Sequence, residues 1–241
     1  MKAVLIALTL AAIVLLAYWS IRVALGVQVS KRLIQEAIPY EKQSTDTSVS
    51  FLVLGDSTAV GVGANTPEDS LAGRVAKYIG ATEVENYAVS GATVRDLPGQ
   101  IKKAQLAVYS VILVQIGAND IVRFHPAGST SALLAEELKA LPKAGTIIVI
   151  SAGDVGDATL IPQPLRPFYT RLNRAYHAAF QTVLSPEGIR YVNLGAAPGS
   201  DLFSNYPKTY LAADGFHPSS AGYGIWFNAI KPALPAPAGK K

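Results

Sequence analysis

Two stretches decide the fold: residues 50–57 read SFLVLGDS, and residues 109–116 read YSVILVQI. Each contains a short, almost wholly apolar run, and Gly55 closes the first one. Such runs are typical of central strands in a parallel sheet, which helices cover on both faces. A third run, TIIVIS, occupies residues 146–151. We therefore predict an α/β domain built on a buried parallel sheet.

The rest of the chain alternates in the same way. Weaker strand patterns lie at residues 82–88 and 190–194. Helical patterns separate the strands, at residues 67–78, 94–106, 131–141, 165–184 and 219–230. This alternation predicts a doubly wound sheet of about five parallel strands with helices on both faces. In such a sheet a functional site lies beyond the carboxyl ends of the strands.

The N-terminal segment 3–21, AVLIALTLAAIVLLAYWSI, carries no charge. As a helix it is about 28 Å long, close to the hydrocarbon thickness of a bilayer. Tyr18 and Trp19 stand at one end of it, and aromatic rings of this kind favour the headgroup level. We predict that residues 1–22 form a transmembrane signal anchor that is not cleaved.

A cleavable signal peptide is the alternative for this segment, with Ala24-Leu25-Gly26 as its small-x-small site and a secreted product. The length of the apolar stretch favours the anchor. Lys2 argues for a cytoplasmic N-terminus, whereas Arg22, Lys31 and Arg32 argue against it. Because N-terminal anchors with short tails usually translocate the chain on their C-terminal side, we expect the globular domain outside the cytoplasm, in the periplasm or at the cell surface.

Composition divides the remainder of the chain. We expect a stalk or linker over residues 23–48, a globular domain over 49–232 and a flexible Pro/Ala-rich tail over 233–241. Half of the 241 residues are apolar, which is enough for a large core. The net charge of +4 comes with no dense basic stripe, so nucleic acid is not an expected partner. The absence of cysteine excludes disulfides, thiolate nucleophiles and cysteine-ligated metals.

Two motifs together suggest nucleophilic catalysis. Gly55-Asp56-Ser57 follows the first strand directly, which places the Ser57 hydroxyl at the carboxyl edge of the sheet. A serine hydroxyl is a weak nucleophile and needs an adjacent base. The segment 214–217, DGFH, offers His217 as that base and Asp214 as the carboxylate that fixes the imidazole tautomer. Alone, each motif is more commonly a turn or a helix cap.

Two further motifs offer hydrogen-bond donors for an oxyanion. Gly91 follows the second strand and has an unobstructed backbone N–H, and Asn119 follows the third strand with a side-chain amide. In isolation Gly91 would be a turn residue and Asn119 a helix cap. All these groups, however, fall at the carboxyl ends of strands or in the entry loop of the last helix. Their coincidence therefore predicts one catalytic site.

These segments resemble the signature blocks of the SGNH (GDSL-like) hydrolase superfamily: GDS, then NYAVSGAT, QIGAND and DGFHP, in order across residues 51–223. The resemblance implies a flavodoxin-like doubly wound fold and a serine esterase. It implies Ser57 as nucleophile, His217 as general base and acid, and Asp214 as the orienting carboxylate. It also implies that the oxyanion donors are the Ser57 and Gly91 N–H groups and the Asn119 side chain. Thr58 departs from the leucine of the GDSL motif, which leaves the substrate class open.

The leading hypothesis is a membrane-anchored esterase that cleaves O-acetyl or short acyl groups through an acyl-enzyme, without cofactor or metal. Small esters, acylated glycans and lysophospholipid-type esters are the candidate substrates. An O-acyltransferase that uses the same triad is one alternative. A catalytically idle glycan- or lipid-binding module tethered to the membrane is another, although the complete set of catalytic groups argues against it. The oligomeric state does not follow from the sequence.

The other polar and aromatic candidates receive structural interpretations. His125 and His177 have no partner at a useful spacing, so we expect them at the surface. Asp154 and Asp157 are expected to form turns rather than a metal site. Three arginines of the long helix are expected on a solvated face: Arg166, Arg171 and Arg174. Three aromatic residues near the catalytic loop are expected to pack, with an acyl pocket as the alternative: Tyr206, Tyr210 and Phe216.

Overall fold

The computed structural model describes residues 1–151, 153–185 and 188–236, and its centre is one five-stranded parallel sheet. The strands lie in the order β2-β1-β3-β4-β5. Their bounds are β1 (Ser50–Gly55), β2 (Glu83–Asn86), β3 (Val108–Gln115), β4 (Lys143–Ser151) and β5 (Arg190–Asn193). Leu52 of β1 pairs with Ile112 of β3, which pairs in turn with Ile147 of β4. The predicted doubly wound parallel sheet is confirmed.

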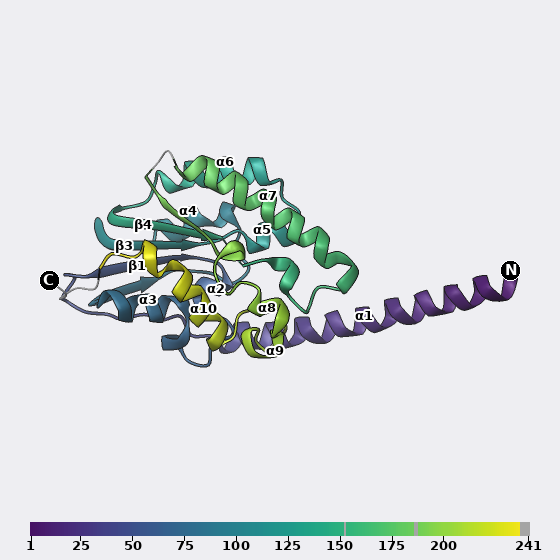
Figure 1. Cartoon of the computed structure of the whole chain (residues 1–241). Helices are drawn as coiled ribbons and strands as arrows, with labels where there is room; N and C mark the ends of the chain where they lie inside the picture. The colour runs from purple at the N-terminus through teal and green to yellow at the C-terminus, as the bar shows by residue number, and fades with distance from the viewer. Residues whose placement is uncertain (152, 186–187, 237–241) are drawn as a thin grey trace.

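Helices cover both faces of this sheet (Figure 1). Successive residues of a strand point to opposite faces, so Phe51 and Val53 enter one core and Leu52 and Leu54 the other. The first core is closed by α3 (Leu71–Ile79) and α10 (Ser220–Ile230). The second is closed by α4 (Leu97–Ile101), α6 (Ala127–Leu138) and α7 (Arg166–Leu184). This two-sided burial explains why the central strands are apolar on both faces.

Several short elements are not predicted as separate elements by the sequence. The short α-helices are α2 (Ser57–Val60), α5 (Ala118–Val122), α8 (Leu202–Asn205) and α9 (Pro207–Tyr210). The 3-10 turns are η1 (Pro67–Asp69), η2 (Val94–Asp96), η3 (Val155–Asp157), η4 (Gln163–Leu165), η6 (Leu194–Ala196) and η7 (Lys231–Ala233). Elements of three to five residues are too short to show a helical period.

The helix predicted over residues 94–106 is shorter in the structure. There η2 is followed directly by α4, which ends at Ile101. The chain has to turn back there because β3 begins at Val108. The Gln105 N–H donates to the carboxylate of Glu85, which fixes this return. The prediction of one continuous helix over this segment is therefore wrong.

The N-terminal helix α1 (Lys2–Glu36) extends away from the domain (Figure 1). It is long and apolar enough to cross a membrane, and a signal sequence would share these properties. No residue of this helix is buried, but its C-terminal part meets the domain. A β-carbon placed on Gly26 would overlap Leu160 Cδ1 and lie 3.4 Å from the backbone oxygen of Asp214. Lys42, further along the chain, pairs with Val84 of β2.

Candidate active site

The structure brings Ser57, His217 and Asp214 together at the carboxyl edge of the sheet. Ser57 is the first residue of α2, directly after β1, and the other two belong to the loop before α10. The Ser57 Oγ atom lies 2.8 Å from His217 Nε2, and His217 Nδ1 lies 2.6 Å from Asp214 Oδ2. All three residues are buried. Residues 160 positions apart in sequence thus form one hydrogen-bonded chain.

The loop itself holds the Asp214 carboxylate in place. Its Oδ1 atom accepts the backbone N–H groups of Phe216 at 2.9 Å and His217 at 3.1 Å. Burial acts to raise the pKa of Asp214, but the hydrogen bonds and charge of His217 and the two N–H groups outweigh it and lower the pKa. The carboxylate is therefore ionised and suited to orient the imidazole.

Gly91 and Asn119 flank the same edge. Within the described parts of the chain, neither the Ser57 N–H nor the Gly91 N–H donates a hydrogen bond to another group. Gly91 adopts a φ of 84°, a left-handed conformation that favours glycine. The Asn119 side-chain amide donates one hydrogen bond to the Ala92 carbonyl at 3.0 Å, which leaves its second N–H for another acceptor.

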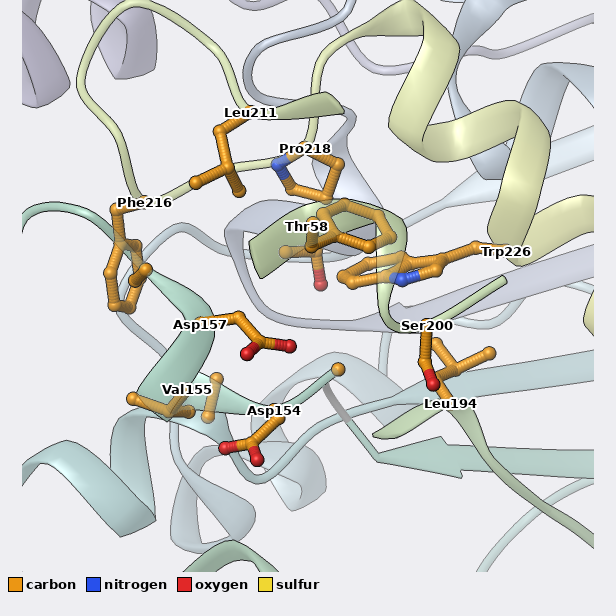
Figure 2. Close-up of a pocket in the computed structure, with 14 residues that line it drawn as sticks. Thr58, Asp154, Val155, Asp157, Leu194, Ser200, Leu211, Phe216, Pro218 and Trp226 are labelled. Carbon is orange, nitrogen blue, oxygen red and sulfur yellow. The ribbon is translucent and has the colours of Figure 1, made fainter. Parts of the chain in front are cut away.

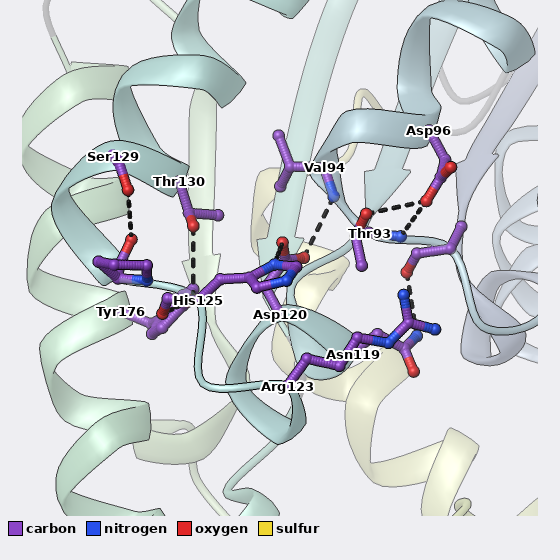
Figure 3. Close-up of polar contacts among 12 residues, drawn as sticks. Thr93, Val94, Asp96, Asn119, Asp120, Arg123, His125, Ser129, Thr130 and Tyr176 are labelled. Atoms are coloured by element: carbon purple, nitrogen blue, oxygen red, sulfur yellow. Dashed lines mark hydrogen bonds and ion pairs between the residues drawn. The ribbon is translucent and has the colours of Figure 1, made fainter.

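A polar network supports the segment that carries Gly91 (Figure 3). The Arg123 guanidinium donates to the Gly91 carbonyl at 3.0 Å. The Asp120 carboxylate accepts the Val94 N–H at 3.1 Å and lies 3.0 Å from His125 Nδ1. His125 is thus paired, and its interpretation as a partnerless surface residue is wrong. The role of Arg123 cannot be read from the sequence pattern, because its partner Gly91 lies 32 positions away.

A second network lies beneath the serine. Asp56 is buried, and its Oδ1 atom accepts the backbone N–H of Thr58 at 2.9 Å and the Thr58 hydroxyl at 2.6 Å. The Gln115 amide donates in turn to the Thr58 hydroxyl at 2.6 Å. Burial raises the pKa of Asp56 to about 6, and the hydrogen bonds from Thr58 offset only part of that effect. The sequence does mark Gln115 as a candidate site residue, because it is a polar residue near the end of an otherwise apolar strand.

A small apolar pocket adjoins this site (Figure 2). Thr58 is one of the lining residues, and much of the lining is apolar: Leu211, Phe216, Pro218 and Trp226, which Figure 2 labels, and Phe203. The pocket has a volume of about 40 Å³, room for roughly three waters. Phe216 therefore lines a pocket, whereas Tyr206 is exposed and Tyr210 packs against Phe203.

Two acidic residues also face this pocket, Asp154 and Asp157 (Figure 2). Asp154 caps η3 by accepting the Gly156 N–H at 2.8 Å, as a turn former does. Burial and the neighbouring Asp154 charge raise the pKa of Asp157 to about 6. Within the described residues, no group of three or more His, Cys, Asp or Glu side chains is arranged to hold a metal.

His177 is buried, and the prediction that it lies at the surface is wrong. Its Nδ1 atom lies 2.7 Å from the Ser151 hydroxyl and 2.6 Å from the Tyr191 hydroxyl. Its Nε2 atom lies 2.8 Å from the Asn173 amide nitrogen. Burial lowers the pKa of His177 to about 4, so the ring is neutral at ordinary pH. The cluster joins α7 to β4 and β5 within the protein.

The sheet order and the Ser–His–Asp geometry define a hydrolase class, and comparison with known proteins identifies the family. The chain belongs to the GDSL-like lipase/acylhydrolase family, whose model matches residues 53–225. A GDSL-like esterase of Mycobacterium tuberculosis is 32% identical over 205 residues. That match includes 77% of this chain but 63% of the relative, so the chain spans somewhat less than two thirds of the relative's length.

Solved structures share the fold. An acetylxylan esterase from Geobacillus stearothermophilus aligns with a TM-score of 0.58 at 19% identity, over 80% of this chain and 97% of its own. A phospholipase A1 from Streptomyces albidoflavus gives a TM-score of 0.58 at 16% identity, over 77% and 99% of the two chains. A lipolytic G-D-S-L family protein from Veillonella parvula gives 0.62 at 14% identity, over 77% and 98%. At these identities the likeness concerns the fold.

Proposed function

We propose that this protein is a serine esterase with Ser57 as nucleophile, His217 as general base and acid, and Asp214 as the orienting carboxylate. The observation that carries the proposal is the 2.8 Å separation of Ser57 Oγ and His217 Nε2, with Asp214 on the opposite ring nitrogen. This geometry lets His217 accept the hydroxyl proton as Oγ attacks an ester carbonyl. The proton then passes to the leaving alkoxide, and an acyl-enzyme remains.

Water completes the reaction in the second step. His217 accepts a proton from the water, the resulting hydroxide attacks the acyl carbonyl, and the proton returns to Ser57 Oγ as the carboxylic acid leaves. The negative charge on each tetrahedral intermediate would be stabilised by the Ser57 and Gly91 N–H groups and the free N–H of Asn119. Donors that are already in place are effective because they need little reorganisation during the reaction.

The size of the apolar pocket supports a small acyl group. Its volume of about 40 Å³, room for roughly three waters, suits an acetyl or similarly short chain. We therefore propose O-acetyl or short acyl esters as the substrate class. The acetylxylan esterase of Geobacillus stearothermophilus is a structural neighbour that acts on such an ester.

We also propose a domain organisation in which residues 1–22 are a transmembrane anchor and the hydrolase domain occupies residues 49–232, outside the cytoplasm. Residues 23–48 join the two; most of the predicted tail, residues 237–241, lies outside the described part of the chain. The support is the apolar character of α1 and the position of Tyr18 and Trp19 at the end of its uncharged stretch. Protease accessibility of the domain in intact cells tests which side it occupies.

A fluorophosphonate probe and an ester panel test the enzyme. The probe should label Ser57, and labelling should vanish in Ser57→Ala. The panel consists of para-nitrophenyl esters from acetyl to dodecanoyl, and kcat/KM should fall as the acyl chain outgrows the pocket. Hydrolysis that persists unchanged in Ser57→Ala or His217→Ala would refute the mechanism. Addition of a sugar acceptor to the same assay would reveal acyl transfer by the formation of an acylated sugar.

A further inference from the structure

The C-terminal part of α1 forms a groove with the back of the catalytic loop. Arg22 and Gly26 line one wall, and Leu160, Arg166 and Lys208 line the opposite side. Residues 212–215, which include Asp214, also line it. The groove has a volume of about 770 Å³. The helix and the active-site loop are thus neighbours.

The point along α1 where the helix meets the domain sets how far the active-site edge lies from a membrane that α1 spans. Arg22 ends the uncharged stretch, and its guanidinium lies about 6 Å from the ring centres of Tyr18 and Trp19. This group of residues favours the headgroup level. Gly26, where the helix meets Leu160, is four residues further, which is about 6 Å along the axis. The carboxyl edge of the sheet therefore lies close to the headgroups if α1 spans a bilayer.

The groove carries unbalanced positive charge. Its lining includes Arg22, Arg166 and Lys208 and a single acidic residue, Asp214, whose carboxylate is engaged with His217. None of the three cations forms an ion pair within the part of the chain that the structure describes. Burial lowers the pKa of Arg166; the Asp157 charge opposes this, and the smaller effect of the Arg22 charge adds to it. The three cations without ion-pair partners would attract an anionic partner.

Large apolar side chains stand beside Arg166. Leu165 is 48% exposed and Phe168 is 49% exposed, on either side of Arg166 at the start of α7. Phe124 is 58% exposed, and its ring centre lies 6.0 Å from that of Phe168. Phe124 is also the one non-glycine residue with a positive φ among the described residues, at 57°. An aromatic residue in this strained conformation is uncommon and is often tied to function.

We propose that this rim, formed by Arg22, Phe124, Leu165, Arg166, Phe168 and Lys208, docks on the surface of a bilayer that contains anionic lipids. Apolar side chains beside cations are the combination that binds such an interface. The active site then opens at headgroup level and takes short acyl esters from molecules held at the membrane. This inference rests on the proposal that α1 spans the membrane, and it adds the orientation of the domain and the source of the substrate.

The absence of cysteine allows a clean test of this docking. The full chain with Phe168→Cys carries a nitrobenzoxadiazole label and is reconstituted in vesicles of phosphatidylcholine, with or without phosphatidylglycerol. Val108→Cys is the matched control, because Val108 is 59% exposed but begins β3 at the opposite edge of the sheet. We expect spin-labelled lipids to quench the label at 168, more strongly with phosphatidylglycerol, and to leave the label at 108 unquenched. Equal quenching at both positions, or none at 168, would overturn the proposal.

A second arm tests the charges. Arg166→Gln and Lys208→Gln in the Phe168→Cys chain should each lower the ratio of docked to undocked domain about fivefold in phosphatidylglycerol vesicles. Lys143→Gln, at the exposed start of β4, is the control and should leave the ratio unchanged. Quenching that is insensitive to both substitutions would contradict the charge assignment. Fluorophosphonate labelling reports the enzyme separately. Absence of docking in the Phe168→Cys chain with all three cations intact, with labelling retained, therefore refutes this inference alone.

Discussion

At the scale of single residues, Asn119 is the clearest test of the oxyanion site. Its amide donates one hydrogen bond to the Ala92 carbonyl, and the other N–H is available to a developing oxyanion. Asn119→Ala should lower kcat on para-nitrophenyl acetate by about 100- to 1,000-fold, because one preorganised donor is lost in the transition state. KM should change little. A kcat within a few fold of wild type would remove Asn119 from the oxyanion site.

Arg123 supports the oxyanion site indirectly, by holding the backbone of Gly91. Its guanidinium holds the Gly91 carbonyl, so we expect Arg123→Met to loosen the Gly91 N–H and lower kcat by up to about 100-fold. KM should stay nearly constant, since Arg123 acts on the transition state through Gly91. Arg95→Met is a matched control on a neighbouring exposed residue and should keep full activity. Equal losses in both variants would indicate a general effect on folding rather than positioning.

At the scale of secondary structure, the buried strands were predictable because their burial is visible in sequence. β1, β3 and β4 are covered on both faces, and their residues are apolar without alternation. The short helices α2 and α5 were not predictable, since a turn of four or five residues has no period to detect. They matter for the site because they carry Ser57 and Asn119.

The candidate site was predictable to the extent that its residues follow strands directly. Ser57, Gly91 and Asn119 follow strands of one parallel sheet, so the topology predicts that they lie close together at its carboxyl edge. The cluster around His177 follows no such rule. Its partners Ser151 and Tyr191 come from β4 and β5, and their hydroxyls meet the imidazole only after α7 packs on the sheet.

The His177 cluster predicts how stability depends on pH. Burial lowers the pKa of His177 to about 4, from about 6.5 in an unfolded chain. A neutral buried histidine stabilises the fold fully above pH 6.5, and this contribution is lost as the pH falls toward 4, because the unfolded chain binds the proton first. The loss amounts to at most about 3 kcal/mol. His177→Gln should therefore flatten the fall in Tm between pH 6.5 and 4, measured by calorimetry. Parallel curves for the two proteins would contradict this.

At the scale of the whole molecule, α1 is a long apolar helix whose C-terminal part also packs against the active-site edge. Gly26 lets the helix approach Leu160 and the Asp214 carbonyl, where a β-carbon would overlap the leucine. Arg22, Leu25 and Val29 line the same groove against the catalytic loop. A segment that is removed after export does not need to pack against the mature domain. The fit of this helix end therefore favours retention.

We accordingly expect the membrane-bound protein to keep its first 26 residues, because cleavage after Gly26 would remove one wall of the groove beside the catalytic loop. Intact-mass measurement of the protein extracted from membranes should give the full 25.4 kDa chain. Ala24→Leu provides the control: Ala24 is exposed on α1, and a large residue at that position of the small-x-small site blocks signal cleavage. Apart from the mass of the substitution, both proteins should have the same N-terminus and remain in the membrane fraction. A wild-type chain that begins at Val27 and leaves the membrane, beside a full-length Ala24→Leu chain, would show that the segment is a leader and that the domain acts without the helix.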